Sequence, residues 1–165
     1  MKFSFCPDCG SGLEPKIIGD EGYVPFCKKC DRPWFPLSYT CTITLVASDT
    51  VPEEFALIQQ YNIPNDRFIC VAGYLKPGES AETTSLREVE EEIGLKPLHT
   101  NYIGSYYLER REQLMLGFSA HVKKAEFTLS DEVDKAKWFS AEEAERVLPP
   151  NSIALNLFMD YLKTK

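Results

Sequence analysis

The pattern of apolar positions divides the chain into two parts. Up to about residue 36 the sequence is rich in Gly, Pro and Cys and has no sustained period of 2 or 3.6, so this part cannot build a hydrophobic core of its own. The rest of the chain contains β-branched stretches and segments with helical periodicity. It predicts strands over 39–47, 55–59, 68–72, 102–108, 114–122 and 137–139, and helices over 80–93, 141–147 and 152–162.

This order of elements predicts an α/β fold in which helices cover a mixed sheet. With 165 residues, of which 44% are hydrophobic, the chain can bury one sizeable core and carry a small satellite unit beside it. We therefore expect two domains, a small unit over 1–36 and an α/β domain over 37–165.

Composition and charge narrow the range of partners. No apolar run is long enough to cross a bilayer and the N-terminus lacks a signal-type apolar region, so we expect a soluble, cytoplasmic protein without a membrane partner. A net charge of -7 argues against a chain-wide electrostatic grip on nucleic acid. A small anionic substrate would need metal ions to offset the repulsion.

The cysteines favour a metal site over disulfides. Four of the six form two C-x-x-C pairs separated by 17 residues, the spacing of a tetrahedral zinc site with four thiolate ligands, Cys6, Cys9, Cys27 and Cys30. Because such a site has no open coordination position, we interpret this zinc as structural; a redox role is the weaker alternative. Cys41 and Cys70 lie in apolar runs and are interpreted as core residues. His99 and His121 have no partner at ligand spacing and are interpreted as surface or strand residues.

The helix predicted over 80–93 carries the strongest chemical signal. Ser80 is a suitable N-cap and Gly94 a suitable left-handed C-cap. At about 100° per residue, one face of this helix presents three carboxylates, Glu88, Glu91 and Glu92, and a separate arc presents Leu86, Val89 and Ile93 to a core. Three adjacent carboxylates fit a cation site, although a fully solvated acidic face is the alternative reading.

The frame around these carboxylates resembles the Nudix box, G-x5-E-x7-R-E-U-x-E-E-x-G-U with U apolar. A chance match in a chain of this length has a probability on the order of 10⁻⁷. Every defined position is filled, by Gly73, Glu79, Arg87, Glu88, Val89, Glu91, Glu92, Gly94 and Leu95.

The resemblance implies a Nudix α/β/α sandwich and a metal-dependent hydrolase with the box at its cleft. It implies that Arg87 orients the carboxylates and that Glu88, Glu91 and Glu92 are catalytic, with Glu91 a further ligand or the base. The ligands of Mg²⁺ or Mn²⁺ would be the Ala72 carbonyl, Glu88, Glu91, Glu92 and the late acidic residue Glu132.

A zinc ribbon followed by a Nudix domain is similar to the NADH pyrophosphatases. That resemblance implies hydrolysis of the pyrophosphate linkage in a nucleoside diphosphate derivative, a small-molecule nucleotide as substrate and a homodimer, with no nucleic acid partner expected. Phe35 and Tyr74 match aromatic positions that stack on the base in that family.

One segment departs from the NADH pyrophosphatase pattern. Where that family has S-Q-P-W-P-F-P, this chain has the residues 105–111, of which only the serine agrees. Tyr106 is a candidate for ring stacking, and Arg110 with Arg111 either holds a second phosphate or flanks a solvated turn. NADH specificity is therefore not expected, and FAD or ADP-ribose hydrolysis is an alternative. The rival from another class is a non-catalytic ligand sensor or binding protein, which would not need the complete box.

Overall fold

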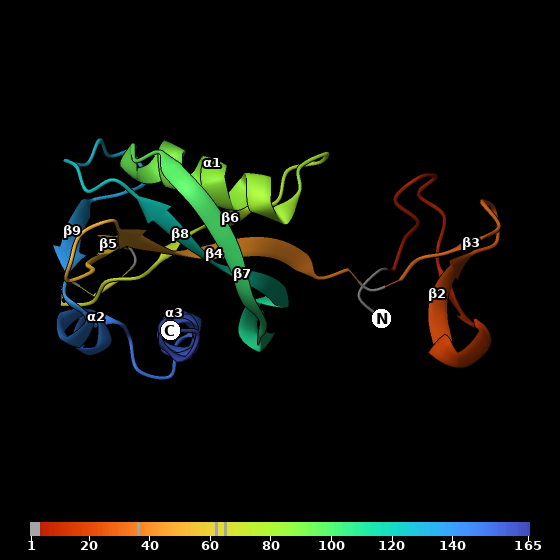
Figure 1. The fold of residues 1–165 in the computed structure, drawn as a ribbon. Coiled ribbons are helices and arrows are strands. Elements are labelled where there is room, and N and C mark those ends of the chain that lie inside the picture. Colours follow the sequence, from red (N-terminus) through yellow and green to blue (C-terminus); the bar gives the residue numbers. More distant parts are fainter. Residues whose placement is uncertain (1–3, 36, 62, 65) are drawn as a thin grey trace. The chain divides into compact units, whose positions relative to one another are not determined.

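The computed structural model describes residues 4–35, 37–61, 63–64 and 66–165, and these form two compact units (Figure 1). The division falls between Met1–Ser38 and Tyr39–Lys165, two residues after the boundary expected at residue 36. Residues 1–3 and Pro36, which belong to the predicted ribbon, lie outside the described residues. Among the described helices, none combines the length and the apolar character that a membrane crossing requires.

The first unit is a three-stranded antiparallel sheet in the order β1-β2-β3. Its elements are β1 (Glu14–Ile17), η1 (Gly19–Glu21), β2 (Tyr23–Cys27) and β3 (Arg32–Pro33). Cys6, Leu13 and Cys27 form a buried cluster against which Cys9, Cys30 and Trp34 pack, and Val24 and Phe26 of β2 are buried as well. Since this core is small, apolar burial alone provides little stability for the unit.

The second unit contains a six-stranded mixed sheet in the order β7-β8-β4-β5-β9, with β6 also paired to β4. The pairing of β4 with β8 is parallel and the other pairings are antiparallel. The strands are β4 (Tyr39–Ser48), β5 (Phe55–Gln59), β6 (Val71–Tyr74), β7 (Pro97–Leu108), β8 (Gln113–Val122) and β9 (Lys135–Phe139), and η2 (Glu109–Arg111) joins β7 to β8.

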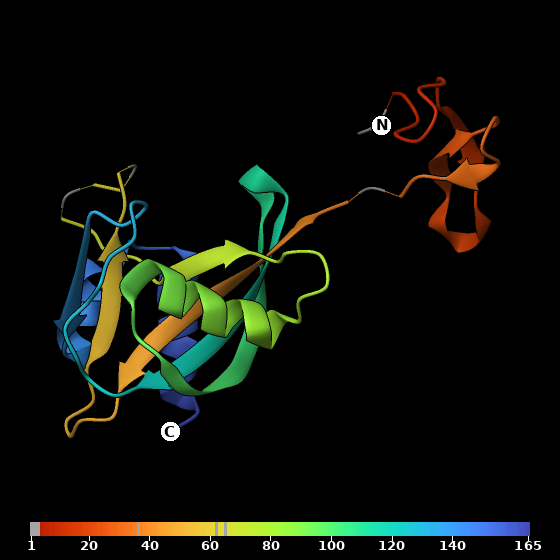
Figure 2. The same cartoon turned by 90° about the horizontal axis from the view of Figure 1, so that it is seen from above.

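Helices cover both faces of this sheet, and the central strand β4 is buried on both of its sides. On β4 the alternate residues Cys41, Ile43, Leu45 and Ala47 pack into a core with the two C-terminal helices, α2 (Ala141–Val147) and α3 (Ile153–Lys163). Val46 belongs to a second core, on the side of α1 (Ala81–Ile93). Figure 1 shows the sheet between α1 and the α2–α3 pair, and Figure 2 shows α1 lying across the sheet. The α/β/α sandwich expected from the sequence is thus confirmed.

Three details differ from the sequence-based prediction. β6 covers Val71–Tyr74 instead of 68–72, because continuous pairing with β4 begins at Val71, whereas Ile69 forms an isolated bridge with Ile58. β7 begins at Pro97 and not at residue 102, since it pairs with β8 along its whole length. On α1, Thr84 and Ser85 are fully buried whereas Leu86 is only half-buried. The Ser85 hydroxyl shares a hydrogen bond of 2.8 Å with Thr44 of β4, so a polar pair provides part of this helix contact.

Candidate functional site

The helix α1 begins and ends at the predicted caps. The Ser80 hydroxyl accepts a hydrogen bond from the backbone N–H of Thr83, and Gly94 adopts a left-handed conformation with φ of 69°. Its N–H donates to the Glu90 carbonyl at 3.0 Å. Val89 and Ile93 are completely buried, which anchors the helix on the sheet. The carboxylates of the opposite face are therefore held by a rigid element.

Arg87 lies at the centre of a network of carboxylates. Its guanidinium donates to both oxygens of Glu79, at 2.7 Å and 2.9 Å, and to Glu88 at 2.7 Å and Glu91 at 2.8 Å. Hydrogen bonds from Arg87 and then Thr84 lower the pKa of Glu79 to about 2. The guanidinium pKa is raised in turn, chiefly by Glu79. This network fixes the orientation of the carboxylates, as the Nudix resemblance implies for Arg87.

Gly73 on β6 provides the space that Glu88 occupies. A Cβ atom at this position would lie 1.9 Å from the Glu88 carboxyl carbon and 2.0 Å from Oε1. No other residue fits there without moving the carboxylate. The first glycine of the box is therefore required by this close approach.

Glu92 is the carboxylate whose environment most clearly requires a cation. It is only 4% exposed, and its Oε2 atom is buried without a hydrogen-bond partner. Burial, followed by the charges of Glu88, Glu132 and Glu91, raises the pKa of Glu92 to about 8. A buried carboxylate oxygen is costly unless it is paired or coordinates a metal. Since Mg²⁺ and Mn²⁺ prefer oxygen ligands, the residues present fit a divalent cation.

A cleft of about 1310 Å³ brings together most of the residues selected from the sequence. Its lining includes Ala72, Tyr74, Arg87, Glu88, Glu91, Glu92, Arg110, Arg111 and Glu132. These residues come from β6, α1, η2 and the loop before β9, segments that only the folded chain assembles.

One predicted substrate contact of the second unit, Tyr106, does not line this cleft. Tyr106 packs against the core beside α3, where its hydroxyl donates to Asp160 at 2.9 Å, and its neighbour Tyr107 lines the cleft instead. The ring of Tyr106 fits there because residue 117 is glycine. A Cβ atom at this position would lie 2.7 Å from the ring. Phe35 belongs to the first unit, where its side chain is 43% exposed.

Gln113 was not identified from the sequence, although it supports a cleft residue. It is buried, and its Nε2 donates to the Tyr74 hydroxyl at 2.7 Å and contacts the Cys41 sulfur at 3.5 Å. Tyr39 packs edge-on against Tyr74 with 6.3 Å between ring centroids. A lone glutamine after a turn carries no motif, so no signal in the sequence marked this role.

The four cysteines of the two C-x-x-C pairs form a compact cluster in the first unit. Their sulfur atoms all lie within 4.8 Å of one another, with separations of 3.6 Å for Cys9 and Cys27 and 3.9 Å for Cys6 and Cys30. Tetrahedral zinc with Zn–S bonds of about 2.3 Å places its sulfurs about 3.8 Å apart. The cluster therefore fits a zinc ion with all four ligands supplied by protein. Cys41 and Cys70 are buried in the core of the second unit, as predicted.

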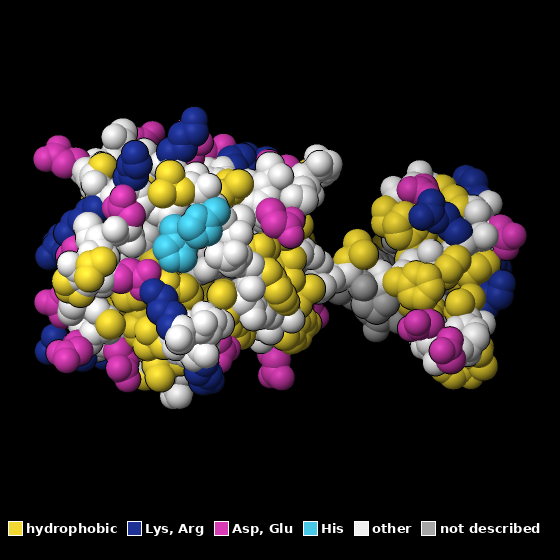
Figure 3. All heavy atoms as spheres, in the orientation of Figure 1, with side chains coloured by type: hydrophobic (Ala, Val, Ile, Leu, Met, Phe, Trp, Pro, Cys, Tyr) yellow, Lys and Arg dark blue, Asp and Glu magenta, His cyan; other side chains and the backbone are white. Residues whose placement is uncertain are grey.

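The two histidines of the chain lie outside the cleft. Their rings stack at a centroid distance of 4.6 Å across β7 and β8, and they form the adjacent pair visible in Figure 3. His121 contacts the Tyr161 hydroxyl at 3.2 Å and Glu53 at 3.5 Å. Burial, followed by the charge of His99, lowers the pKa of His121. Their interpretation as strand residues is confirmed.

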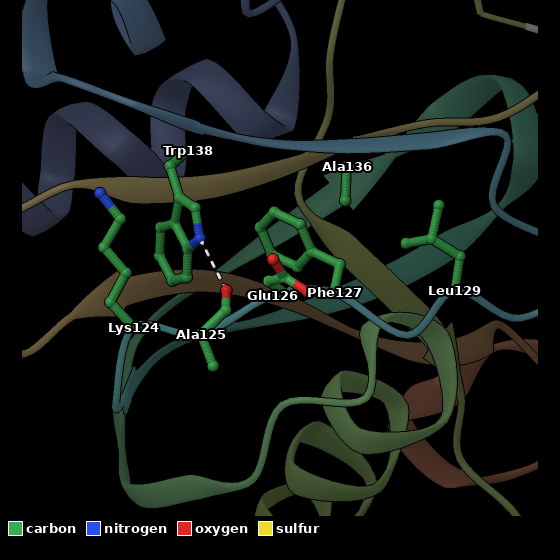
Figure 4. Close-up of a pocket in the computed structure, with 7 residues that line it drawn as sticks. All are labelled: Lys124, Ala125, Glu126, Phe127, Leu129, Ala136 and Trp138. Atoms are coloured by element: carbon green, nitrogen blue, oxygen red, sulfur yellow. Dashed lines mark hydrogen bonds between the residues drawn. The ribbon is translucent and has the colours of Figure 1, made fainter.

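A second, shallower pocket of about 720 Å³ lies beside β9 (Figure 4). Trp138 stacks on Phe127 at 5.2 Å and donates from its indole nitrogen to the Ala125 carbonyl at 3.1 Å. The one lysine that lines it, Lys124, is paired with Glu54. Because its two rings stack on each other and its lysine is paired, this pocket is explained by packing of the loop before β9.

Comparison with known proteins agrees with this geometry. A family profile described as NUDIX domain matches residues 42–160, which includes the cleft carboxylates. The chain belongs to the Nudix family. Among curated relatives, the NAD-capped RNA hydrolase NUDT12 of Macaca fascicularis is 32% identical over 155 residues, covering 89% of this chain and 33% of the relative. The NAD-capped RNA hydrolase NudC of Pseudomonas putida is 31% identical over 159 residues, covering 96% of this chain and 55% of the relative.

The match covers only part of the length of these relatives. This chain spans about a third of the length of the first and just over half of the second. Among solved structures, a NUDIX hydrolase from Nitrosomonas europaea superimposes with a TM-score of 0.69 at 21% identity, covering 98% of this chain and 89% of that one. This structural likeness supports the Nudix fold.

Proposed function

We propose that this Nudix protein is a pyrophosphatase that uses Mg²⁺ or Mn²⁺ to cut the pyrophosphate linkage of a nucleoside diphosphate derivative. The observation that carries the proposal is the buried, unpartnered Oε2 of Glu92 beside carboxylates that Arg87 holds in place. A solvated acidic face, the alternative considered for this helix, would leave Glu92 exposed.

The residues that would hold the cations are the Ala72 carbonyl, Glu88, Glu91, Glu92 and Glu132. A divalent ion in this position supplies polarisation of the phosphoryl oxygens and lowers the pKa of a nucleophilic water. Arg87 keeps Glu88 and Glu91 oriented before substrate arrives, which avoids reorganisation during the reaction. Glu91, whose side chain is 53% exposed, remains accessible as a further ligand or as the base that accepts the proton of the water.

The first unit contributes structure in this proposal. Zn²⁺ bound by Cys6, Cys9, Cys27 and Cys30 would hold the ribbon together, since its core is otherwise very small. With four protein ligands the ion has no position for a substrate or water, so catalysis is assigned to the cleft alone.

The substrate class proposed is an adenine-containing pyrophosphate. The relatives are named for hydrolysis of NAD-capped RNA, and Tyr74 and Tyr107 line the cleft as candidates for stacking on a flat ring. The proline-rich NADH signature is replaced by residues 105–111, so we expect no strong preference for the nicotinamide end. FAD and ADP-ribose stay as alternatives, and RNA is a partner only if the capped end of an RNA enters the same cleft.

A sensor without turnover is the less favoured alternative. Ligand binding alone does not require Arg87 to be bonded to three carboxylates, nor a buried carboxylate oxygen without a partner. The homodimer and the cytoplasmic location expected from the sequence stay predictions, which sedimentation of the purified protein and imaging in cells would test.

The proposed function is tested by measuring kcat/KM for NADH, NAD, FAD, ADP-ribose and diadenosine polyphosphates under one Mg²⁺ or Mn²⁺ condition. We expect release of a nucleoside monophosphate from several of them, none without added metal, and no more than a tenfold preference for NADH, which equals about 1.4 kcal/mol. Undiminished hydrolysis in excess chelator, or no hydrolysis of any substrate, would contradict the proposal.

A further inference from the structure

Arg110 and Arg111 are two cations of the cleft that the proposed cation site does not use. Both lie on η2, the turn between β7 and β8, and both line the cleft. Within the described ranges of the chain, neither makes an ion pair with a carboxylate. The other cleft cations are engaged: Arg87 binds three glutamates, and the ammonium of Lys76 lies 3.7 Å from Glu91.

The backbone that carries these arginines is held in place. The N–H of Glu112, which is in a left-handed conformation, donates to the Glu109 carbonyl at 3.1 Å and so closes the turn. The Glu112 carbonyl accepts from the N–H of Tyr39 at the same distance, which ties the turn to the start of β4. A fixed turn reduces the entropic cost of using its two exposed side chains for binding.

The cleft lining therefore carries charges of both signs. It includes the carboxylates of α1 and the arginines of η2, and residues of the central strands, Cys41, Ile43 and Met115, line the same cleft. Charges of both signs act on the thiol of Cys41. Burial raises its pKa most, the charge of Glu88 raises it further, and the charge of Arg111 lowers it. If the carboxylates bind the cations and, through them, the scissile pyrophosphate, the arginines are available for a different anion.

We propose that Arg110 and Arg111 form a binding site for a phosphate group beyond the scissile pyrophosphate. The inference rests on the proposed function, which defines the scissile linkage, and it adds a preference, within the proposed substrates, for nucleotides that carry an additional phosphate. Guanidinium groups suit this role because they stay charged and present forked N–H donors to phosphate oxygens. The additional phosphate could be in line, as in a longer polyphosphate chain, or an ester on a ribose.

The experiment compares matched pairs of substrates that differ in this phosphate. Diadenosine tetraphosphate against diadenosine diphosphate tests the in-line source, and NADPH against NADH tests the ribose ester. For each pair we would measure the ratio of kcat/KM in the wild type, in the double variants Arg110→Gln with Arg111→Gln and Arg110→Lys with Arg111→Lys, and in Arg146→Gln. Arg146 is an exposed arginine on α2 outside the cleft and serves as the matched control.

In at least one pair, we expect the glutamine double variant to lower the ratio about tenfold. The lysine double variant should retain part of the ratio because it keeps the charge but loses the fork. Arg146→Gln should leave the ratio at the wild-type value. Ratios unchanged by the glutamine variant in both pairs would overturn the proposal and show that the arginines only flank a solvated turn.

Binding measurements separate this proposal from the proposed function. Calorimetric Kd values for the same pairs in Mg²⁺ report the phosphate site even in a protein that hydrolyses none of them. Kd ratios that depend on the arginines without any turnover would support the site and refute the hydrolase. Turnover together with Kd ratios that the arginine variants leave unchanged would support the hydrolase and refute the phosphate site. Both arginines are exposed, so equal melting temperatures of the variants should confirm intact folding.

Discussion

The cysteine cluster and the carboxylate helix each gather several side chains proposed to bind metal, but the two sets depend on their surroundings in opposite ways. In the first unit the proposed ligands form much of the core, since Cys6 and Cys27 are two of the three buried members of its cysteine-containing cluster. In the second unit Glu88, Glu91 and Glu92 lie on a helix whose Val89 and Ile93 are buried in an apolar core of ten residues. A unit whose core is formed by the metal ligands should unfold without its ion. A unit whose ligands lie outside the apolar core should stay folded.

The largest effect expected from this comparison is the loss of the ribbon on removal of zinc. Structural zinc sites contribute an apparent binding free energy of about 10–16 kcal/mol, far more than this small core can replace. Chelation, or Cys27→Ala, should abolish amide protection in β1 and β2 while β4 and β8 stay protected, as measured by hydrogen exchange. Lys28→Ala, an exposed neighbour, is the control. Absence of zinc by elemental analysis together with unchanged protection in Cys27→Ala would contradict the assignment.

The same kind of change in the carboxylate helix should remove activity and leave the fold. Glu92→Gln should lower turnover about 10³-fold, equivalent to about 4 kcal/mol, because one ligand is lost where charge develops in the transition state. Above pH 8, where Glu92 is ionised, the melting temperature of the metal-free protein should not fall, because the substitution removes a buried charge. Glu90→Gln, an exposed residue of the same helix outside the cleft, is the matched control. Full activity in Glu92→Gln would refute the assigned cation site.

A smaller loss of activity is expected when the space for Glu88 is filled. Gly73→Ala would place a methyl group 1.9 Å from the Glu88 carboxyl carbon, so that the carboxylate must move. We expect turnover to fall about 10²-fold, or about 2.7 kcal/mol, measured as kcat under saturating metal. Gly12→Ala is the control, because a Cβ atom there meets nothing within 4 Å. Equal activities of the two variants would show that the position of Glu88 is not critical.

The smallest expected effect is a dependence of stability on pH, in which Glu92 and Glu79 of the carboxylate network act in opposite directions. The pKa of Glu92 is raised from 4.5 to about 8, so in the metal-free protein its contribution to stability is complete below pH 4.5 and is lost as pH rises to 8. Glu79 has the opposite sign, because its pKa is lowered to about 2 and its contribution is lost as pH falls from 4.5 toward 2.

Thermal melts in chelator should therefore show a melting temperature that falls between pH 5 and 8. Glu92→Gln should flatten this fall, and Mg²⁺ should oppose it because a cation compensates the ionised carboxylate. The acid limb below pH 4.5 should remain in Glu92→Gln. If Glu92→Gln leaves the fall in melting temperature between pH 5 and 8 unchanged, the titrating group is not Glu92.

Prediction from the sequence was most accurate where function and local structure use the same residues. The box residues on α1, from the Ser80 cap to the Gly94 cap, lie as the helical period predicts. It was least accurate where packing decides between neighbours, as for Tyr106 and Tyr107. In a strand these two side chains point to opposite faces, and the choice depends on the space above Gly117. Likewise Thr84 and Ser85 are buried in place of Leu86, because β4 presents a hydroxyl at Thr44.

The sequence by itself determined the two ligand sets, because short fixed spacings such as C-x-x-C and the period of a helix bring their members together locally. Only the tertiary structure decided the remaining features of the cleft. Three features depend on pairings between strands that are distant in the chain: the burial of Glu92, the support of Tyr74 by Gln113, and the presence of Arg110 and Arg111 in the same cleft as the carboxylates. Those pairings follow from the joint packing of two cores on one sheet, and no local pattern of residues specifies them.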